Sequence, residues 1–255
     1  MTGITWRRVR VTDPQMTQMN TDDYLRPICV ICGSKPMNIA LFDIDGTLTE
    51  SNEIDSICFA DAFRDVFGVE LDTDWDSYLH TTDRGIVMEA LRRLHGRDAD
   101  AREIALHRAR FVQLLAERMT ELKEVPGAAA FIAQVQARDW RVVLCTGAWS
   151  DSARLKLLRA GLPTGLPVAS CDDDVAREGI LRRGIALAGG SKSDVIVSFG
   201  DAPWDARAAA NRQLPFIGIA AGARAESLRR SGAAEVFADF EDAAAVLAAI
   251  DALGD

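Results

Sequence analysis

Apolar residues follow two different patterns along the chain. Residues 38–42 form a short apolar run that ends at Asp43 and is typical of a buried strand. From residue 51 to 125, apolar residues recur at helical spacing in three segments, 54–68, 86–96 and 104–122. Pro126-Gly127 closes this region. The pattern therefore predicts one strand followed by a long helical stretch.

Beyond Pro126 the pattern changes to short apolar runs separated by helical segments. The predicted strands cover residues 141–145, 194–199, 216–219 and 235–237. The predicted helices lie around residues 127–137, 150–160, 177–188, 204–212, 224–231 and 241–253. Strands that alternate with helices are typical of a parallel sheet covered on both faces. We therefore predict an α/β fold. Its Rossmann-like, three-layer core covers 37–50 and 126–255, and a helical insert, 51–125, interrupts it just after the first strand.

Residues 1–36 differ from the rest of the chain. They show no sustained periodicity among scattered polar residues, so we predict a poorly ordered N-terminal extension. Met37 stands just before the first strand, and we hypothesise that translation begins there. Cys29 and Cys32 form a CxxC pair, but no second CxxC or histidine pair in the sequence completes a zinc site. We interpret them as two thiols in a tail.

Composition narrows the classes of function. Hydrophobic residues make up 48% and charged residues 26% of the 255, as in ordinary soluble globular proteins. The net charge of −9 disfavours nucleic acids and anionic membranes as partners, although a bound metal would still admit an anionic substrate. No apolar run reaches the roughly 20 residues of a membrane-spanning helix. The N-terminus lacks the apolar segment of a signal peptide, so we expect a cytoplasmic protein. Five scattered cysteines argue against a disulfide framework.

Three of the predicted strands end in polar residues suited to one reaction. The first runs into Asp43-Ile44-Asp45-Gly46-Thr47, another into Thr146-Gly147, and a third into Gly200-Asp201-Ala202-Pro203-Trp204-Asp205. In open α/β sheets, ligands bind at the carboxyl ends of the strands. We therefore expect the fold to bring these three segments together, although they are far apart in the sequence.

Four aspartates would then share one crevice: Asp43, Asp45, Asp201 and Asp205. Like charges raise one another's pKa values and destabilise a fold. Magnesium resolves the conflict, because it prefers oxygen ligands and often binds a few carboxylates together with a substrate phosphate. A single aspartate is more often a helix cap or a turn residue. The set at successive strand ends nevertheless favours a Mg²⁺ site.

The same segments resemble the motifs of a known family. Residues 43–47 resemble the DxDGT signature of the haloacid dehalogenase (HAD) superfamily. Thr146-Gly147 is similar to the second motif of that family, and residues 200–205 are similar to its fourth, GDxxxD. The resemblance covers about residues 38–253, and the insert resembles a C1-type cap. The most similar subgroup is that of the phosphoglycolate phosphatase-like and β-phosphoglucomutase-like enzymes.

The resemblance implies a Mg²⁺-dependent phosphatase that hydrolyses a small-molecule phosphate monoester through an aspartyl-phosphate. It implies that Asp43 is the nucleophile, and that Asp45 protonates the leaving oxygen and then deprotonates water. Asp43 and Asp201 would bind the metal directly, Asp205 directly or through water, and Asp45 through its main-chain carbonyl. Monomer or homodimer is the expected state of assembly.

The other motif positions would contact the phosphate. Thr146 and Gly147 would hydrogen-bond phosphoryl oxygens, and Gly46 and Thr47 would shape the turn and approach them with N–H groups. The family's third motif usually supplies a lysine followed by proline, which this sequence lacks. Our candidate for that cation is Arg177, and Lys192 is the alternative.

The polar loop Thr81–Gly85 precedes a predicted helix of the insert and is the candidate specificity loop. Thr82 and Arg84 are its candidate substrate-binding residues, Arg84 through a substrate carboxylate or second phosphate. A plain helix N-cap at Thr82 or Asp83 and a solvent-exposed Arg84 are the alternatives.

Several aromatic residues leave two roles open. Trp149 and Trp204 closely follow two of the motifs. Their side chains could line the pocket or cover the edge of the sheet, and the sequence does not distinguish the two roles. The three histidines lack the spacing of metal ligands, and we predict that they are surface or packing residues: His80, His95 and His107.

Two other functions remain open at this stage. A sugar phosphomutase of the same superfamily uses the same aspartate pair, and it would release an isomer rather than free phosphate. A non-catalytic phosphate-binding or regulatory protein is the alternative from a different class. Asp45 argues against a dehalogenase, since such enzymes usually lack the second aspartate.

Overall fold

A parallel sheet forms the centre of the fold. The computed structural model describes residues 37–191 and 194–254, and within them six strands form a sheet in the order β3-β2-β1-β4-β5-β6. All five neighbouring pairs are parallel. The strands are β1 (Asn38–Phe42), β2 (Arg141–Cys145), β3 (Val168–Ala169), β4 (Val195–Gly200), β5 (Phe216–Ile219) and β6 (Glu235–Phe237). The predicted α/β fold with a parallel sheet is confirmed.

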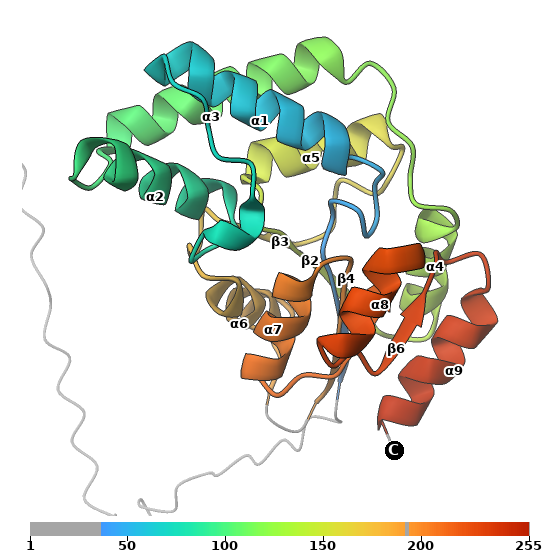
Figure 1. Cartoon of the computed structure of the whole chain (residues 1–255). Coiled ribbons are helices and arrows are strands. Elements are labelled where there is room, and N and C mark those ends of the chain that lie inside the picture. The colour runs from blue at the N-terminus through green and yellow to red at the C-terminus, as the bar shows by residue number, and fades with distance from the viewer. Residues whose placement is uncertain (1–36, 192–193, 255) are drawn as a thin grey trace, which may run out of the picture. The chain divides into compact units, whose positions relative to one another are not determined.

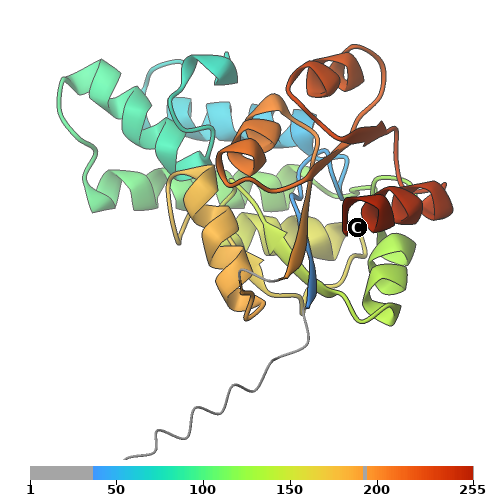
Figure 2. The same cartoon turned by 90° about the horizontal axis from the view of Figure 1, so that it is seen from below.

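Helices cover both faces of this sheet, as Figures 1 and 2 show. They are α4 (Ala128–Ala137), α5 (Ser150–Arg159), α6 (Arg177–Leu187), α7 (Pro203–Asn211), α8 (Gly222–Arg230) and α9 (Ala243–Gly254). Alternate residues of β1 point to opposite faces. Ile39 and Leu41 belong to an apolar cluster with α6 and α7, and Ala40 and Phe42 to another with α4 and α9.

The insert between β1 and β2 is helical, as predicted. It contains α1 (Asn52–Phe67), a 3₁₀ turn (Trp75–Ser77), α2 (Asp83–His95) and α3 (Ala101–Arg118). The three helices lie together at the carboxyl end of the sheet (Figure 1). No described helix is long and apolar enough to cross a membrane. The predicted N-terminal extension and its CxxC pair lie outside the described residues.

Aromatic side chains fill the interior of the insert. Phe59 of α1 packs edge-on against Phe111 of α3, with ring centroids 5.3 Å apart. Trp149, at the start of α5, stacks on Phe59 with a centroid distance of 6.1 Å and is almost fully buried. Trp149 therefore joins the insert to the core as a packing residue.

His107 lies in this aromatic cluster and gives it a pH dependence. Its ring is fully buried against Phe59 and Phe63, and its Nε2 lies 3.1 Å from the Phe59 carbonyl oxygen. Burial lowers the pKa of His107 to about 4, although the contact with the Phe59 carbonyl raises it. His107 is thus a packing residue, one of the two roles predicted for it.

In the unfolded chain His107 takes up a proton below about pH 6.5, whereas in the folded protein it does so only below about pH 4. We therefore expect this residue to lower the free energy of unfolding as the pH falls. The loss runs from about pH 6.5 to 4 and reaches about 3 kcal/mol of unfolding free energy. His107→Phe should remove this part of the pH dependence. Urea unfolding of both proteins across that range measures it. Parallel pH curves for wild type and variant would contradict the expectation.

Candidate active site

The register of the sheet brings three chain segments together. β1 lies between β2 and β4, and Phe42 pairs with Leu144 on one side and with Phe199 on the other. The residues just beyond these positions therefore meet at the carboxyl edge. Asp43 follows β1 directly, and its N–H donates to the Phe199 carbonyl at 3.0 Å.

Three carboxylates converge at this edge. Oxygens of Asp43, Asp201 and Asp205 all lie within 4.8 Å of one another, and all three residues are buried. Burial, and next the Asp205 carboxylate, raise the pKa of Asp43 well above its usual range. Burial and the same neighbour raise the pKa of Asp201 to about 7. Burial also raises the pKa of Asp205, although Arg177 lowers it.

The charges and the geometry of this group fit a bound metal ion. Three buried carboxylates that disfavour one another's ionisation need a cation, and carboxylate oxygens are the ligands of a hard divalent ion. Asp43, Asp201 and Asp205 could supply them. The side chain of Asp45 is outside this group, and the main-chain contact with the metal stays a prediction.

The turn after β1 is shaped around Asp201. Gly46 has a φ of 75°, and a Cβ there would lie 2.1 Å from Asp201 Oδ2, so only glycine fits. Asn52 and Arg224 donate to the same oxygen at 2.9 Å and 2.8 Å. The N–H groups of Gly46 and Thr47 donate within the turn, to Thr49 and Ile44 carbonyls. Both N–H groups were expected to approach the phosphate, but in this structure they are used within the turn.

Arg177 supplies positive charge to the site from the first residue of α6. Its Nη1 lies 3.6 Å from Asp43 Oδ1 and forms an ion pair with Asp205. Its Nε donates to the Thr81 carbonyl at 3.1 Å, which fixes the direction of the guanidinium. A Cβ on Gly147 would lie 2.6 Å from Arg177 Nη2, so this glycine makes room for the cation. The alternative, Lys192, lies outside the described residues.

Polar groups of the second motif lie beside the nucleophile candidate. Thr146, Gly147 and Arg177 line a small cavity together with Asp43 and Asp205. The Thr146 hydroxyl accepts from the Ala148 N–H at 3.0 Å. Among the described residues, none accepts a hydrogen bond from the Gly147 N–H. The Thr47 hydroxyl donates to Asp43 Oδ2 at 3.5 Å.

The candidate specificity loop, Thr81–Gly85, leads into α2, and the hydroxyl of Thr82 is used to cap that helix. Thr82 is the N-cap of α2, where its hydroxyl accepts from the Gly85 N–H at 3.2 Å and donates to the Val175 carbonyl at 2.8 Å. A cavity lies between the insert and the carboxyl edge of the sheet, and we call it the main cavity because Asp45 and Asp201 line it. In the part of the chain that the structure describes, neither Thr82 nor Arg84 lines this cavity. Thr81 and Asp83 of the same loop do line it.

A buried ammonium group beside Asp45 was missed by the sequence analysis. Lys156 of α5 is fully buried, and its Nζ lies 2.7 Å and 2.8 Å from the two carboxylate oxygens of Asp45. It also forms an ion pair with Asp55 of α1, and Ser51 donates to Asp45. Burial disfavours the charged form of Lys156, but the nearby carboxylates of Asp45, Asp55 and Asp83 outweigh it and raise its pKa.

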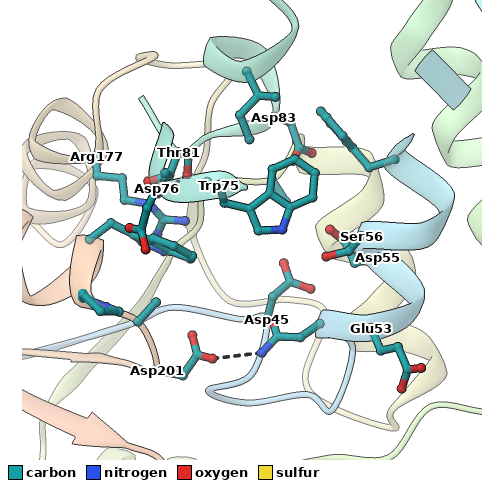
Figure 3. A pocket seen from close by; sticks show the side chains of 18 of the residues that line it. Asp45, Glu53, Asp55, Ser56, Trp75, Asp76, Thr81, Asp83, Arg177 and Asp201 are labelled. Carbon is teal, nitrogen blue, oxygen red and sulfur yellow. Dashed lines mark hydrogen bonds between the residues drawn. The ribbon is translucent and has the colours of Figure 1, made fainter. Parts of the chain in front are cut away.

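The main cavity lies between the insert and the carboxyl edge of the sheet. Its volume is about 510 Å³, and Figure 3 shows its lining. Asp45 and Asp201 belong to its lower part in this view, with Trp75 and Asp83 above them. Trp204 lines the cavity, which is one of the two roles left open for it. Its ring lies 5.8 Å from the Arg177 guanidinium. A small substrate could occupy this space with one end at the carboxylates.

Comparison with known proteins points to one family. The family model for haloacid dehalogenase-like hydrolases matches residues 37–211. Comparison with the curated proteins gave no match.

Several solved structures share the fold. A hydrolase from Pseudomonas syringae has a TM-score of 0.68 at 19% identity, covering 83% of this chain and 98% of that one. CbbY from Rhodobacter sphaeroides, solved in complex with phosphate, has a TM-score of 0.64 at 22% identity, covering 84% and 99%. A predicted phosphoglycolate phosphatase from Haemophilus somnus has a TM-score of 0.60 at 14% identity, covering 83% and 98%.

Proposed function

The chain belongs to the haloacid dehalogenase-like hydrolase family, and from this premise we propose that it is a Mg²⁺-dependent phosphatase of a small-molecule phosphate monoester. The observation that carries the proposal is the convergence of Asp43, Asp201 and Asp205 beside Arg177. The phosphate bound to the CbbY structure and the similarity to a predicted phosphoglycolate phosphatase from Haemophilus somnus support a phosphate ester as substrate.

The metal site would consist of side chains of Asp43, Asp201 and Asp205 together with the Asp45 main-chain carbonyl. When bound there, Mg²⁺ would neutralise phosphoryl charge and favour in-line displacement. Asn52 and Arg224, which donate to Asp201, would keep that carboxylate in position.

Asp43 is the proposed nucleophile. One of its carboxylate oxygens forms a bond to phosphorus while the bond from phosphorus to the alcohol oxygen breaks, and the phosphoryl group is left on the aspartate. Arg177, 3.6 Å from Asp43 Oδ1, would offset the charge that accumulates there. Thr146 and the N–H of Gly147 would hydrogen-bond the phosphoryl oxygens.

Asp45 is the proposed acid and base. It would give a proton to the departing alcohol oxygen, and then take one from the water that attacks phosphorus and frees Asp43. Such positioned proton transfer contributes typically about 10²–10⁴-fold to a rate. Lys156 and Ser51, which bind both oxygens of Asp45, would fix its orientation. The helices of the insert, proposed as a cap over 51–125, would exclude bulk water from the cavity.

Removal of the metal tests this proposal. Protein treated with a chelator should not hydrolyse p-nitrophenyl phosphate, and added Mg²⁺ should restore the activity and raise the midpoint of thermal unfolding. Asp201→Asn should lose both effects. A panel of phosphate esters then follows, in which release of inorganic phosphate distinguishes a phosphatase from a phosphomutase. Full activity in the chelator, or no activity on any ester with Mg²⁺, would contradict the proposal.

A further inference from the structure

The wall that the insert contributes to the main cavity is acidic. Asp55, Asp76 and Asp83 line it, together with the exposed Glu53 at its edge. Among the described residues, no lysine or arginine of the insert lines the cavity. An alcohol group that reaches away from the phosphate would therefore meet carboxylates.

The two basic residues in the lining belong to the core and already have acidic partners. Arg177 is paired with Asp43 and Asp205, and Arg224 lies 2.8 Å from Asp201. Both therefore contact the phosphate end of the cavity. Neither is available to a negatively charged group bound against the insert.

Buried acidic side chains outnumber buried basic ones around this wall. Lys156 is the ammonium group shared by Asp45 and Asp55, and Asp83 lies close enough to act on its pKa. Asp83 is only 8% exposed. One of its oxygens accepts from the Trp149 N–H at 3.0 Å, and no described residue hydrogen-bonds the other. Three acidic side chains thus face one ammonium group. Burial raises the pKa of Asp83 well above its usual range, and a cation bound beside it would favour the ionised form.

An organic cation fits this imbalance better than a second metal ion. Asp55 and Asp83 do not belong to the group of described residues whose geometry could hold a metal. Two aromatic rings, Phe59 and Trp75, line the cavity as well and pack edge-on with centroids 6.0 Å apart. In Figure 3 the Trp75 indole lies between Asp83 and Asp45. Aromatic faces attract cations, and the attraction grows when the cation is desolvated.

We infer that the alcohol released by this enzyme carries a positively charged amine, which binds between Asp83 and Trp75. The inference rests on the proposed phosphatase function. A substrate with a terminal carboxylate or a second phosphate would place an anion against unbalanced carboxylates and would be rejected. Asp83 and Trp75 are then the residues that determine specificity.

Three esters of equal length test the inference, because their far ends differ in charge. They are 2-aminoethyl phosphate, 2-hydroxyethyl phosphate and phosphoglycolate, with cationic, neutral and anionic ends. With Mg²⁺ present, kcat/KM should fall in that order, by roughly tenfold or more between the first and the last. Equal or greater efficiency on phosphoglycolate would overturn the inference.

Asp83→Asn tests the proposed contact, because it keeps an acceptor for the Trp149 N–H and removes the charge. The ratio of kcat/KM for 2-aminoethyl over 2-hydroxyethyl phosphate should fall roughly tenfold. Glu117→Gln, an equal charge change at an exposed position of α3, should leave the ratio as in wild type. An unchanged ratio in Asp83→Asn would overturn the inference.

A fourth substrate separates this inference from the function on which it rests. Hydrolysis of p-nitrophenyl phosphate without any preference among the three esters would overturn the charge preference alone. If p-nitrophenyl phosphate and all three esters stay intact with Mg²⁺, the proposed phosphatase function fails, and the inference fails with it.

Discussion

Asp43→Asn is expected to abolish turnover without weakening the fold. The amide cannot attack phosphorus, so activity on every phosphate ester should fall by roughly 10⁴-fold or more, as loss of a nucleophile does in other hydrolases. The carboxylate is buried among other carboxylates, which raise its pKa. Removing this charge in metal-free protein should therefore leave the free energy of unfolding equal or higher.

Steady-state kinetics and urea unfolding in a chelator measure the two effects of Asp43→Asn separately. An inactive variant that is also strongly destabilised would show a structural role instead of a chemical one. Activity within tenfold of wild type would remove Asp43 from the mechanism.

Lys156→Met is expected to have the largest effect on stability. Methionine fills much of the same volume, but it leaves the carboxylates of Asp45 and Asp55 without their buried partner. Loss of one member of a buried ion pair typically costs about 3–5 kcal/mol, and we expect a decrease of that size in the free energy of unfolding. Urea denaturation in a chelator measures it.

A matched surface variant provides the control for Lys156→Met. Arg138 pairs with Asp251 at 2.8 Å, and both side chains are largely exposed. Arg138→Met should therefore cost at most about 1 kcal/mol. Adding Asp55→Asn to Lys156→Met should recover part of the loss, because it removes one of the stranded charges. Equal effects of the two single variants would contradict the role assigned to Lys156.

The strands were predictable from the sequence where each one forms an apolar run between helices. The predicted strand at 194–199 differs by one residue from β4 (Val195–Gly200). The two residues of β3 were missed, because their strand conformation depends on pairing with β2. Two residues cannot show a period, and that pairing partner is distant in the sequence.

The convergence of Asp43 and Asp201 was predictable from their places at the ends of predicted strands. Asp43 and Asp201 directly follow strands, and strand ends in a parallel sheet meet at one edge. Arg177 had an alternative in Lys192, because the loop before α6 rather than the sheet carries Arg177 to the site. Its placement depends on the hydrogen bond to Thr81 and on the space left by Gly147.

Lys156 was missed because it lies in a helix, where a charged residue usually faces solvent. Asp83 was considered only as part of the loop Thr81–Gly85 and as a helix N-cap, and substrate binding was assigned to its neighbours Thr82 and Arg84. For Lys156 the sequence held a signal, since it lies between Ala153 and Leu157 on the face of α5 that becomes buried. Recognising it required the partner carboxylates, and Asp55 belongs to a different part of the fold. Periodicity alone does not give such pairings.

The central claim is that Asp43 carries the phosphoryl group during turnover. Protein mixed with Mg²⁺ and a labelled phosphate ester, then quenched in acid during turnover, can be digested and its peptides examined for covalent phosphate. We expect the label on the peptide that contains Asp43, where hydroxylamine should release it, and no label in Asp43→Asn. Turnover without any covalent label, or with the label on another residue, would contradict the account.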